Sequence, residues 1–111
     1  MDAISQILLL KALDGLSARS AATAENIANA GTDGYRPVRV RFEEALARAA
    51  SGGPAAVEAV VPRLQQAVGG EPLRLDLELA TASQTAARYT ALIDLLSRQL
   101  QIQSLSITGT N

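Results

Sequence analysis

The sequence predicts an all-α protein in which two long helices, one at each end of the chain, form an antiparallel, coiled-coil-like pair around a short irregular or extended middle. Hydrophobic residues make up 48% of the 111 residues but aromatic residues only 3%, so the apolar content is mainly Ala and Leu, which are strong helix formers. Apolar positions recur at helical spacing in both terminal segments, and most Gly and Pro residues lie between them. A chain of this length is expected to form a single small assembly domain.

The first predicted helix covers residues 1–31. Asp2 is expected to cap its start, and Gly31 to end it by adopting a positive φ. Gly15 lies inside the helix, where glycine costs about 1 kcal/mol relative to Ala, so we expect some local flexibility there. The spacing typical of a coiled coil, alternating steps of four and three, joins Leu9, Leu13, Leu16, Ser20, Thr23, Ile27 and Ala30.

The middle, residues 32–75, is predicted to begin with a tight turn at Thr32-Asp33-Gly34. Residues 35–42 then alternate apolar and arginine side chains, which is typical of an extended or strand-like arm. Pro37 has no amide hydrogen, so such a strand would lie at an edge. A short helix is expected to follow, up to about residue 50. Residues 51–72 are left open, because a strand at Val57–Val61 and a loop fit the pattern equally well.

The second long helix is predicted over residues 76–109, with Asp76 as its N-cap. Such a helix would be about 50 Å long at ~1.5 Å per residue, which is too long to pack along its whole length in a small domain. We therefore expect it to project. Its apolar stripe follows steps of three and four through Leu79, Ala82, Ala86, Tyr89, Ile93, Leu96, Leu100, Gln103 and Ile107.

Both terminal helices carry more apolar surface than a two-helix seam needs. A two-helix seam uses two positions in seven, whereas a wider stripe implies contact with more than one neighbour. We therefore expect partner chains to complete the core. The predicted intersubunit face consists of Leu9, Leu13, Leu16, Tyr89, Ile93, Leu96, Leu100 and Ile107.

The chain has no Cys and no His, which removes the commonest nucleophile, general base and metal ligand. Carboxylate chemistry remains, and Asp76 and Glu78 are its nearest candidates. Nothing in the sequence predicts a pocket around these two residues, and capping a helix is their ordinary use. We expect no enzymatic activity, no small-molecule substrate, no cofactor and no metal.

The charge pattern also limits the partners. A net charge of −1 and a pI near 5.3 give no field that would hold nucleic acid or an anionic membrane. The start of the chain has no positive charge ahead of its apolar stretch, so a cleaved signal peptide is not expected. No segment reaches the roughly 20 apolar residues that span a bilayer, so direct membrane insertion is not expected either.

The end of the first helix and the following turn read Ala24-Glu25-Asn26-Ile27-Ala28-Asn29-Ala30-Gly31-Thr32-Asp33-Gly34-Tyr35. This segment resembles the N-terminal signature of flagellar axial proteins, the rod, hook and hook-filament junction family, whose pattern is approximately A-x-N-I-A-N-x-x-T-x-G-Y. Asp33 stands where Pro is usual, a mild departure because Asp also forms turns. The matching positions form the expected assembly motif: Asn26, Ile27, Asn29, Thr32, Gly34 and Tyr35.

Within this family the chain is most similar to the proximal subunits of the flagellar basal-body rod. The likeness covers roughly residues 1–47 and 73–109 and leaves the middle unmatched. Gly69-Gly70-Glu71-Pro72 departs from the Asp-Gly-Asn-like turn expected there, so the subtype is less specific than the family. The likeness rests on small size and on three features, namely Phe42-Glu43-Glu44-Ala45-Leu46, Leu75-Asp76-Leu77-Glu78-Leu79 and Tyr89.

The resemblance implies a structural subunit of the drive shaft that transmits torque. It implies export from the cytoplasm through the flagellar type III apparatus without signal cleavage. It further implies polymerisation in the periplasm with other copies of the chain and other rod subunits. Export substrates of this kind carry a Phe-x-x-x-apolar element, which Phe42 and Leu46 match. The spacing favours a simpler interpretation, in which these two residues dock a short helix.

Two roles remain open for the paired amides Asn26 and Asn29. They lie on one face near the helix end, where they could bond backbone carbonyls or a neighbouring helix, or could be solvated. Gly34 is expected to take a positive φ, and Tyr35 to pack back on the helix. The alternative function is a soluble coiled-coil adaptor or export chaperone that binds client helices reversibly through the same stripes. The signature at residues 24–35 argues against it.

Overall fold

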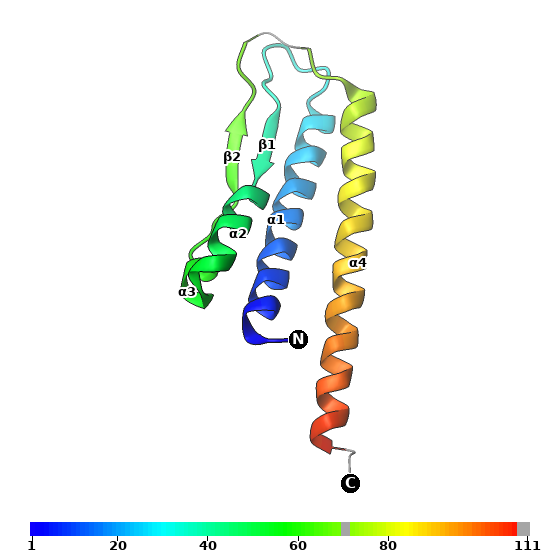
Figure 1. Cartoon of the computed structure of the whole chain (residues 1–111). Coiled ribbons are helices and arrows are strands. Elements are labelled where there is room, and N and C mark those ends of the chain that lie inside the picture. Colours follow the sequence, from blue (N-terminus) through cyan, green and yellow to red (C-terminus); the bar gives the residue numbers. More distant parts are fainter. Residues whose placement is uncertain (70–71, 109–111) are drawn as a thin grey trace.

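A computed structural model of the chain, which describes residues 1–69 and 72–108, has two long antiparallel helices with a smaller segment packed beside the first (Figure 1). Its extents are 64 × 27 × 14 Å, so the molecule is elongated. The elements in chain order are α1 (Ala3–Ala28), β1 (Val38–Arg41), α2 (Glu43–Ala49), the 3-10 turn η1 (Ala50–Gly52), α3 (Pro54–Glu58), β2 (Arg63–Gln66) and α4 (Leu75–Thr108).

The predicted pair of terminal helices is confirmed, and the all-α prediction is correct except for a two-stranded sheet. The ends of α1 follow local chemistry. Asp2 Oδ1 accepts a hydrogen bond from the Ser5 amide at 2.8 Å, so the predicted cap is confirmed. The prediction that Gly31 ends the helix is wrong, because Gly31 has no positive φ. The C-cap is Asn29, whose backbone amide donates a hydrogen bond to the Glu25 carbonyl.

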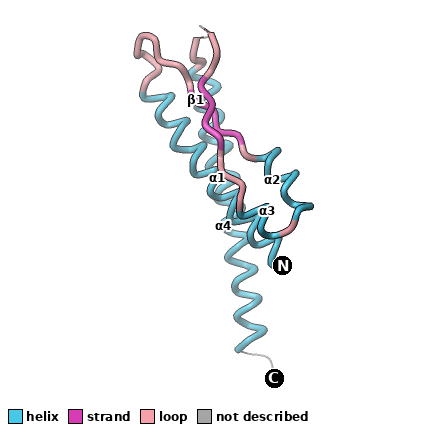
Figure 2. The backbone as a smooth tube through the Cα atoms, turned by 90° about the vertical axis from the view of Figure 1, so that its left-hand side faces the viewer, coloured by secondary structure: helices cyan, strands magenta, loops and turns pink. Residues whose placement is uncertain are grey.

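The middle segment forms the antiparallel ribbon β1–β2, seen side-on in Figure 2. The predicted arm is the edge strand β1, which begins directly after Pro37. A strand at Val57–Val61 is wrong, because Gly53 (φ 91°) and Pro54 begin the short helix α3, which buries Val57 completely. The second strand comes later, at Arg63–Gln66, and all four of its side chains are exposed. Residues 70–71 belong to the segment 69–72 that differs from the expected Asp-Gly-Asn-like turn, and they lie outside the described residues.

The hydrophobic core lies between α1 and the middle segment. Of α4, among the described residues, only the half-buried Leu92 packs against it. The long helix pair therefore does not contain the main core, although the sequence pattern predicted it there. The buried members of the core are Leu16, Ala22, Val40, Phe42, Leu46 and Val57.

Gly15 is a close-packing position within this core. A Cβ at Gly15 would lie 2.5 Å from Cγ and Cδ1 of Phe42, far inside van der Waals contact. The residue is buried, and the ring of Phe42 fills the space that a side chain would need. We had expected flexibility at this glycine, but the structure assigns it a role in packing.

Replacing Gly15 with Ala is expected to lower the free energy of unfolding by about 1–3 kcal/mol, because overpacking outweighs the gain in helix propensity of about 1 kcal/mol. Urea unfolding followed by far-UV circular dichroism measures this change in the free energy of unfolding. Ser17→Ala, at an exposed position of the same helix, is the matched control and should change stability little. If Gly15→Ala costs as much in a Phe42→Leu background, the ring is not the cause.

The long helix α4 begins at Leu75, so Asp76 lies in its first turn and is not the predicted N-cap. The Asp76 carboxylate instead pairs with Arg74 at 2.9 Å, and this hydrogen bond lowers the pKa of Asp76. Near the other end, Gln99 Oε1 accepts a hydrogen bond from the Met1 amino group at 3.3 Å. The last turns of α4 therefore extend past the start of α1, as Figure 1 shows and as its length predicted. Residue 109, the predicted end, lies outside the described residues.

Candidate assembly site

Asn26 is the centre of a buried polar cluster at the end of α1. Its Oδ1 accepts hydrogen bonds from the Tyr35 hydroxyl at 2.8 Å and from the Val38 amide at 2.9 Å. Its Nδ2 donates to the Val38 carbonyl at 2.9 Å and to Glu78 Oε2 at 3.2 Å. The side chain has no exposed surface, and both of its polar atoms have two partners. Asn26 thus pairs with the backbone of β1 much as another strand would.

Glu78 connects this cluster to α4. Its side chain is only 1% exposed, and its second carboxylate oxygen forms an ion pair with Arg39 of β1, whose own side chain is 46% exposed. A buried carboxylate without a partner would cost several kcal/mol, so Arg39 and Asn26 together make the burial of Glu78 tolerable. We call Asn26, Tyr35, Val38, Arg39 and Glu78 the Asn26 cluster. It joins α1, β1 and α4 at one end of the molecule.

Tyr35 is half-buried above Asn26. Burial raises the pKa of its hydroxyl, and the negative charges of Glu25 and Glu78 act in the same direction. The hydroxyl therefore stays protonated and remains a donor to Asn26 over the whole ordinary pH range. The expectation that Tyr35 packs back on the helix is confirmed, with this hydrogen bond as its anchor.

The remaining motif residues shape the turn that brings Tyr35 to Asn26. Asn29 Nδ2 donates to the Glu25 carbonyl at 2.9 Å, and its Oδ1 accepts from Thr32 Oγ1 at 3.2 Å. Gly34 has a φ of 76°, as predicted, and Ile27 is half-buried. The solvated alternative is therefore wrong for the buried Asn26, whereas Asn29 bonds the backbone near the surface of the chain. These contacts lie within one chain, and a role of the motif between chains stays a prediction.

Phe42 and Leu46 are both buried in the core, so in the folded chain they dock α2, the simpler of their two interpretations. Arg19 completes this docking. Its guanidinium lies 4.8 Å from the centroid of the Phe42 ring and bonds both carboxylate oxygens of Glu43, at 2.7 and 2.8 Å. This hydrogen bonding lowers the pKa of Glu43. Export recognition through Phe42 and Leu46 stays a prediction, and it would require an unfolded chain.

The predicted intersubunit face divides into two parts. Its members on α1 are buried inside the chain, because α1 lies between α4 and the middle segment: Leu9, Leu13 and Leu16. These three are not available to a partner of the folded chain, which corrects the prediction for them. On α4, Leu96 is half-buried, and the side chain of Ile107 lies outside the described residues. The members at the surface are Tyr89, Ile93 and Leu100, exposed by 38%, 40% and 53%.

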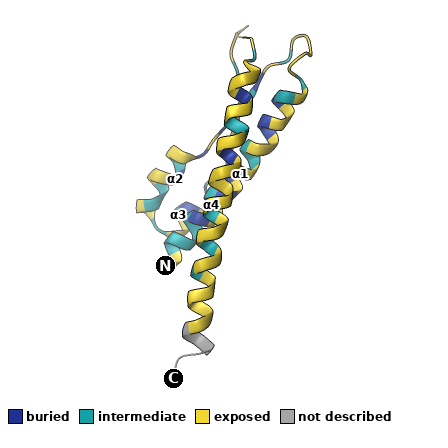
Figure 3. Cartoon of the chain, turned by 90° about the vertical axis from the view of Figure 1, so that its right-hand side faces the viewer, coloured by how far each residue is buried: buried dark blue, intermediate teal, exposed yellow. Residues whose placement is uncertain are grey.

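The side of α4 that faces α1 is more polar than its pattern predicted. Its fully buried residues are Glu78 and Thr85, and the leucines beside them are only half-buried. Counting ~100° per residue, the buried side lies about 60° around the helix from the predicted apolar stripe. Figure 3 shows the result, a helix that is exposed over most of its surface.

Most of the large exposed apolar residues of α4 form two rows, one on each side of the buried stripe, while Leu105 lies on the side opposite that stripe. We call the first the Tyr89 row and the second the Leu95 row. By helical position, the Tyr89 row consists of Leu75, Leu79, Tyr89, Ile93 and Leu100. The Leu95 row consists of Leu77, Leu95 and Ile102.

Residues of the Asn26 cluster outside the motif escaped the sequence analysis. Glu78 was interpreted as a helix-capping residue, and Arg39 as part of an arm that is solvated or ion-paired. The ion pair of Arg39 agrees with the second option, but its partner Glu78 was not predicted. One signal was present, since Glu78 and Thr85 are seven residues apart and so share one side of a helix. A search for apolar periodicity passes over such a polar stripe.

Neither comparison with known proteins nor the side-chain chemistry of the described residues points to a second functional site. No family model and no curated protein matches this chain. Within residues 1–69 and 72–108, no three acidic side chains gather as a metal site would require, and no helix is long and apolar enough to cross a membrane. The likeness to flagellar axial proteins therefore depends on the motif at residues 24–35 and on the shorter matches beside it.

Proposed function

We propose that this chain is a structural subunit of the flagellar basal-body rod, most like the proximal rod subunit FlgB, and that it polymerises through its terminal helices. The observation that carries the proposal is the apolar surface of α4. Most of the large hydrophobic side chains exposed in the described part of the chain lie on this one helix. Contiguous exposed apolar surface is typical of a contact between chains. The motif at residues 24–35 supplies the flagellar assignment.

The surface of α4 suits a polymer better than a closed pair. The Tyr89 row and the Leu95 row lie on opposite sides of the stripe that faces α1. One partner helix would cover one row and leave the other in water, whereas two neighbours would cover both. A subunit inside a packed tube has neighbours on two sides.

The Asn26 cluster suits a subunit that transmits torque. A fully satisfied polar network fixes its elements in one arrangement, because every alternative leaves buried groups without partners. Among the described residues, no buried side-chain polar atom lacks a hydrogen-bond partner. In the proposed rod, α1, β1 and α4 therefore turn as one body.

The proposal includes location and partners. The chain would leave the cytoplasm through the flagellar type III apparatus and assemble in the periplasm with other copies and other rod subunits. This structural role needs no catalysis, cofactor, nucleic acid or membrane insertion. A soluble adaptor or export chaperone would use the same rows for reversible binding of client helices, but would not require a permanent partner on both sides of α4.

Deletion of the gene tests the proposal directly. We expect non-motile cells whose isolated basal bodies lack the rod when viewed by electron microscopy. A plasmid copy of the wild-type gene should restore both the rod and motility, which controls for effects on neighbouring genes. Intact rods in the deletion strain would overturn the proposal. Intact rods together with mislocalised rod subunits in the cytoplasm would favour the chaperone.

A further inference from the structure

Two arginines face each other across the β1–β2 ribbon. Arg41 is directly opposite Arg63 in the antiparallel register, and both side chains are exposed. Like charges at opposed positions destabilise a strand pair unless an anion lies between or beside them. Arg41 Nε donates to Gln65 Oε1 at 2.9 Å, a neutral partner that leaves the positive charge uncompensated.

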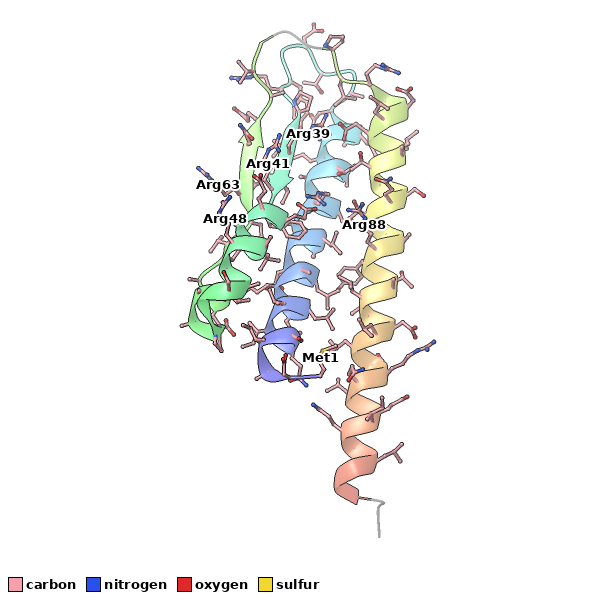
Figure 4. All side chains as sticks on the ribbon, in the orientation of Figure 1. Met1, Arg39, Arg41, Arg48, Arg63 and Arg88 are labelled. Atoms are coloured by element: carbon pink, nitrogen blue, oxygen red, sulfur yellow. The ribbon has the colours of Figure 1, made fainter. Side chains whose placement is uncertain are left out.

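Arg48, on α2, adds a third exposed guanidinium to the same region (Figure 4). None of the three arginines forms an ion pair with a carboxylate in the part of the chain that the structure describes. The other two basic residues nearby do have partners, since Arg19 pairs with Glu43 and Arg39 with Glu78. Among the described arginines of this region, Arg41, Arg48 and Arg63 are therefore the three without a carboxylate partner.

These three side chains line a groove of about 750 Å³ between the middle segment and α4. The floor of the groove is α1, and its far wall is the first turns of α4, where Leu77 and Ala80 contribute apolar surface. Apart from the paired residues, the groove contains one carboxylate, Glu44, against three guanidinium groups. A groove that is part apolar and has spread-out positive charge suits an acidic helix side better than a single small anion.

The chain presents such a helix side itself. Asp14 and Glu25 are exposed on α1 and form no ion pair with the described residues. They are eleven positions apart, which corresponds to ~16 Å along the axis and to within about 20° around it. The exposed Ser17 and Ala21 between them are small, so another surface could approach this side closely.

We infer that the groove of Arg41, Arg48 and Arg63 binds the Asp14–Glu25 side of α1 in a second copy of this chain. The α1 residues that line the groove floor and the Asp14–Glu25 side are about 120° apart around the helix, so the two contact surfaces are different patches. A contact between different patches is heterologous and adds copies head to tail, giving a ring where the rotation closes and an open filament where it does not. The inference rests on the proposed function, in which the second copy is the next subunit of the rod.

Charge reversal with rescue tests the contact. In sedimentation velocity on the purified full chain, Arg41→Glu with Arg63→Glu should weaken self-association at least about tenfold, as should Asp14→Lys with Glu25→Lys. Mixing the two double variants should restore association, because the acidic groove of one variant can then bind the lysine side of the other. Arg36→Glu with Arg74→Glu, outside the groove, matches the change in net charge of the arginine variant and should associate as wild type does. Circular dichroism should show unchanged helix content in all variants.

Cross-linking supplies a second measurement, because the chain has no Cys of its own. A variant with Glu25→Cys and Arg63→Cys should form a ladder of disulfide-linked oligomers, whereas either single substitution should not. A wild-type chain that stays monomeric at every concentration, reversed variants that associate normally, or mixing without rescue would each overturn the inference. Normal rods in cells with Arg41→Glu and Arg63→Glu would also overturn it, while leaving the proposed function, judged by gene deletion, intact.

Discussion

Replacing Asn26 with Leu is expected to remove about 3–5 kcal/mol from the free energy of unfolding, since several buried polar groups lose their partner at once. The groups left behind are the amide and carbonyl of Val38, the Tyr35 hydroxyl and one oxygen of Glu78. Leu has the same number and branching of side-chain heavy atoms, so the change mainly removes the hydrogen-bonding groups of Asn26. A small domain is stable by only about 5–15 kcal/mol, so the loss is a large fraction of the total.

Asn29→Leu is the matched control, because it makes the same substitution three positions later on the same helix. Among the described residues, the side chain of Asn29 bonds the Glu25 carbonyl and Thr32 near the surface, where water can replace it. Its substitution should therefore cost about 1 kcal/mol. Tyr35→Phe removes one hydrogen bond of the cluster and should cost about the same. Urea unfolding measures all three. Equal midpoints for Asn26→Leu and Asn29→Leu would contradict the central role of Asn26.

The Asn26 cluster also explains how α4 stays packed against α1 and the middle segment. Among its described side chains, Glu78 and Thr85 are the fully buried ones, and Leu92 alone packs against the hydrophobic core. Hydrogen exchange should therefore change most along α4 in Asn26→Leu, while α2 and α3 keep a core that is independent of α4.

The elements that the sequence predicts best are those set by local chemistry. Asp2 caps α1 because its side chain needs only the amide of Ser5, three residues away. Gly34 takes a positive φ because the turn requires it and glycine permits it. The strand β2 was missed because its four exposed side chains carry no apolar alternation, and its place depends on backbone pairing with β1.

The rotation of α4 could not be predicted from apolar spacing, because its buried stripe includes Glu78 and Thr85. Glu78 is buried only because Asn26 and Arg39, both more than thirty positions away in sequence, complete its partners. Tertiary contacts of this kind override the apolar pattern of one helix. The consequence for function is that the predicted stripe lies beside the α1 contact, where part of it stays exposed.

Leu100→Asp is expected to abolish rod assembly and motility while leaving synthesis and folding intact. Leu100 belongs to the Tyr89 row and is 53% exposed, so a carboxylate there meets water in the monomer. In a contact between chains the same carboxylate would be buried without a partner, at a cost of several kcal/mol, or at least about a hundredfold in affinity. Swimming assays and electron microscopy of basal bodies measure the outcome, and circular dichroism of the purified chain reports its folding.

Two substitutions to Asp on the same helix separate assembly from folding. Gln101→Asp, at an exposed position away from both apolar rows, should leave motility unchanged, which controls for added charge. Leu96→Asp should impair both assembly and stability, because Leu96 is half-buried beside α1. Normal motility with Leu100→Asp would show that the Tyr89 row is not a contact surface. Because α4 packs on α1 through a largely polar stripe, its two apolar rows stay exposed in the single chain, and Leu100→Asp is expected to weaken contacts with neighbouring chains without unfolding α4.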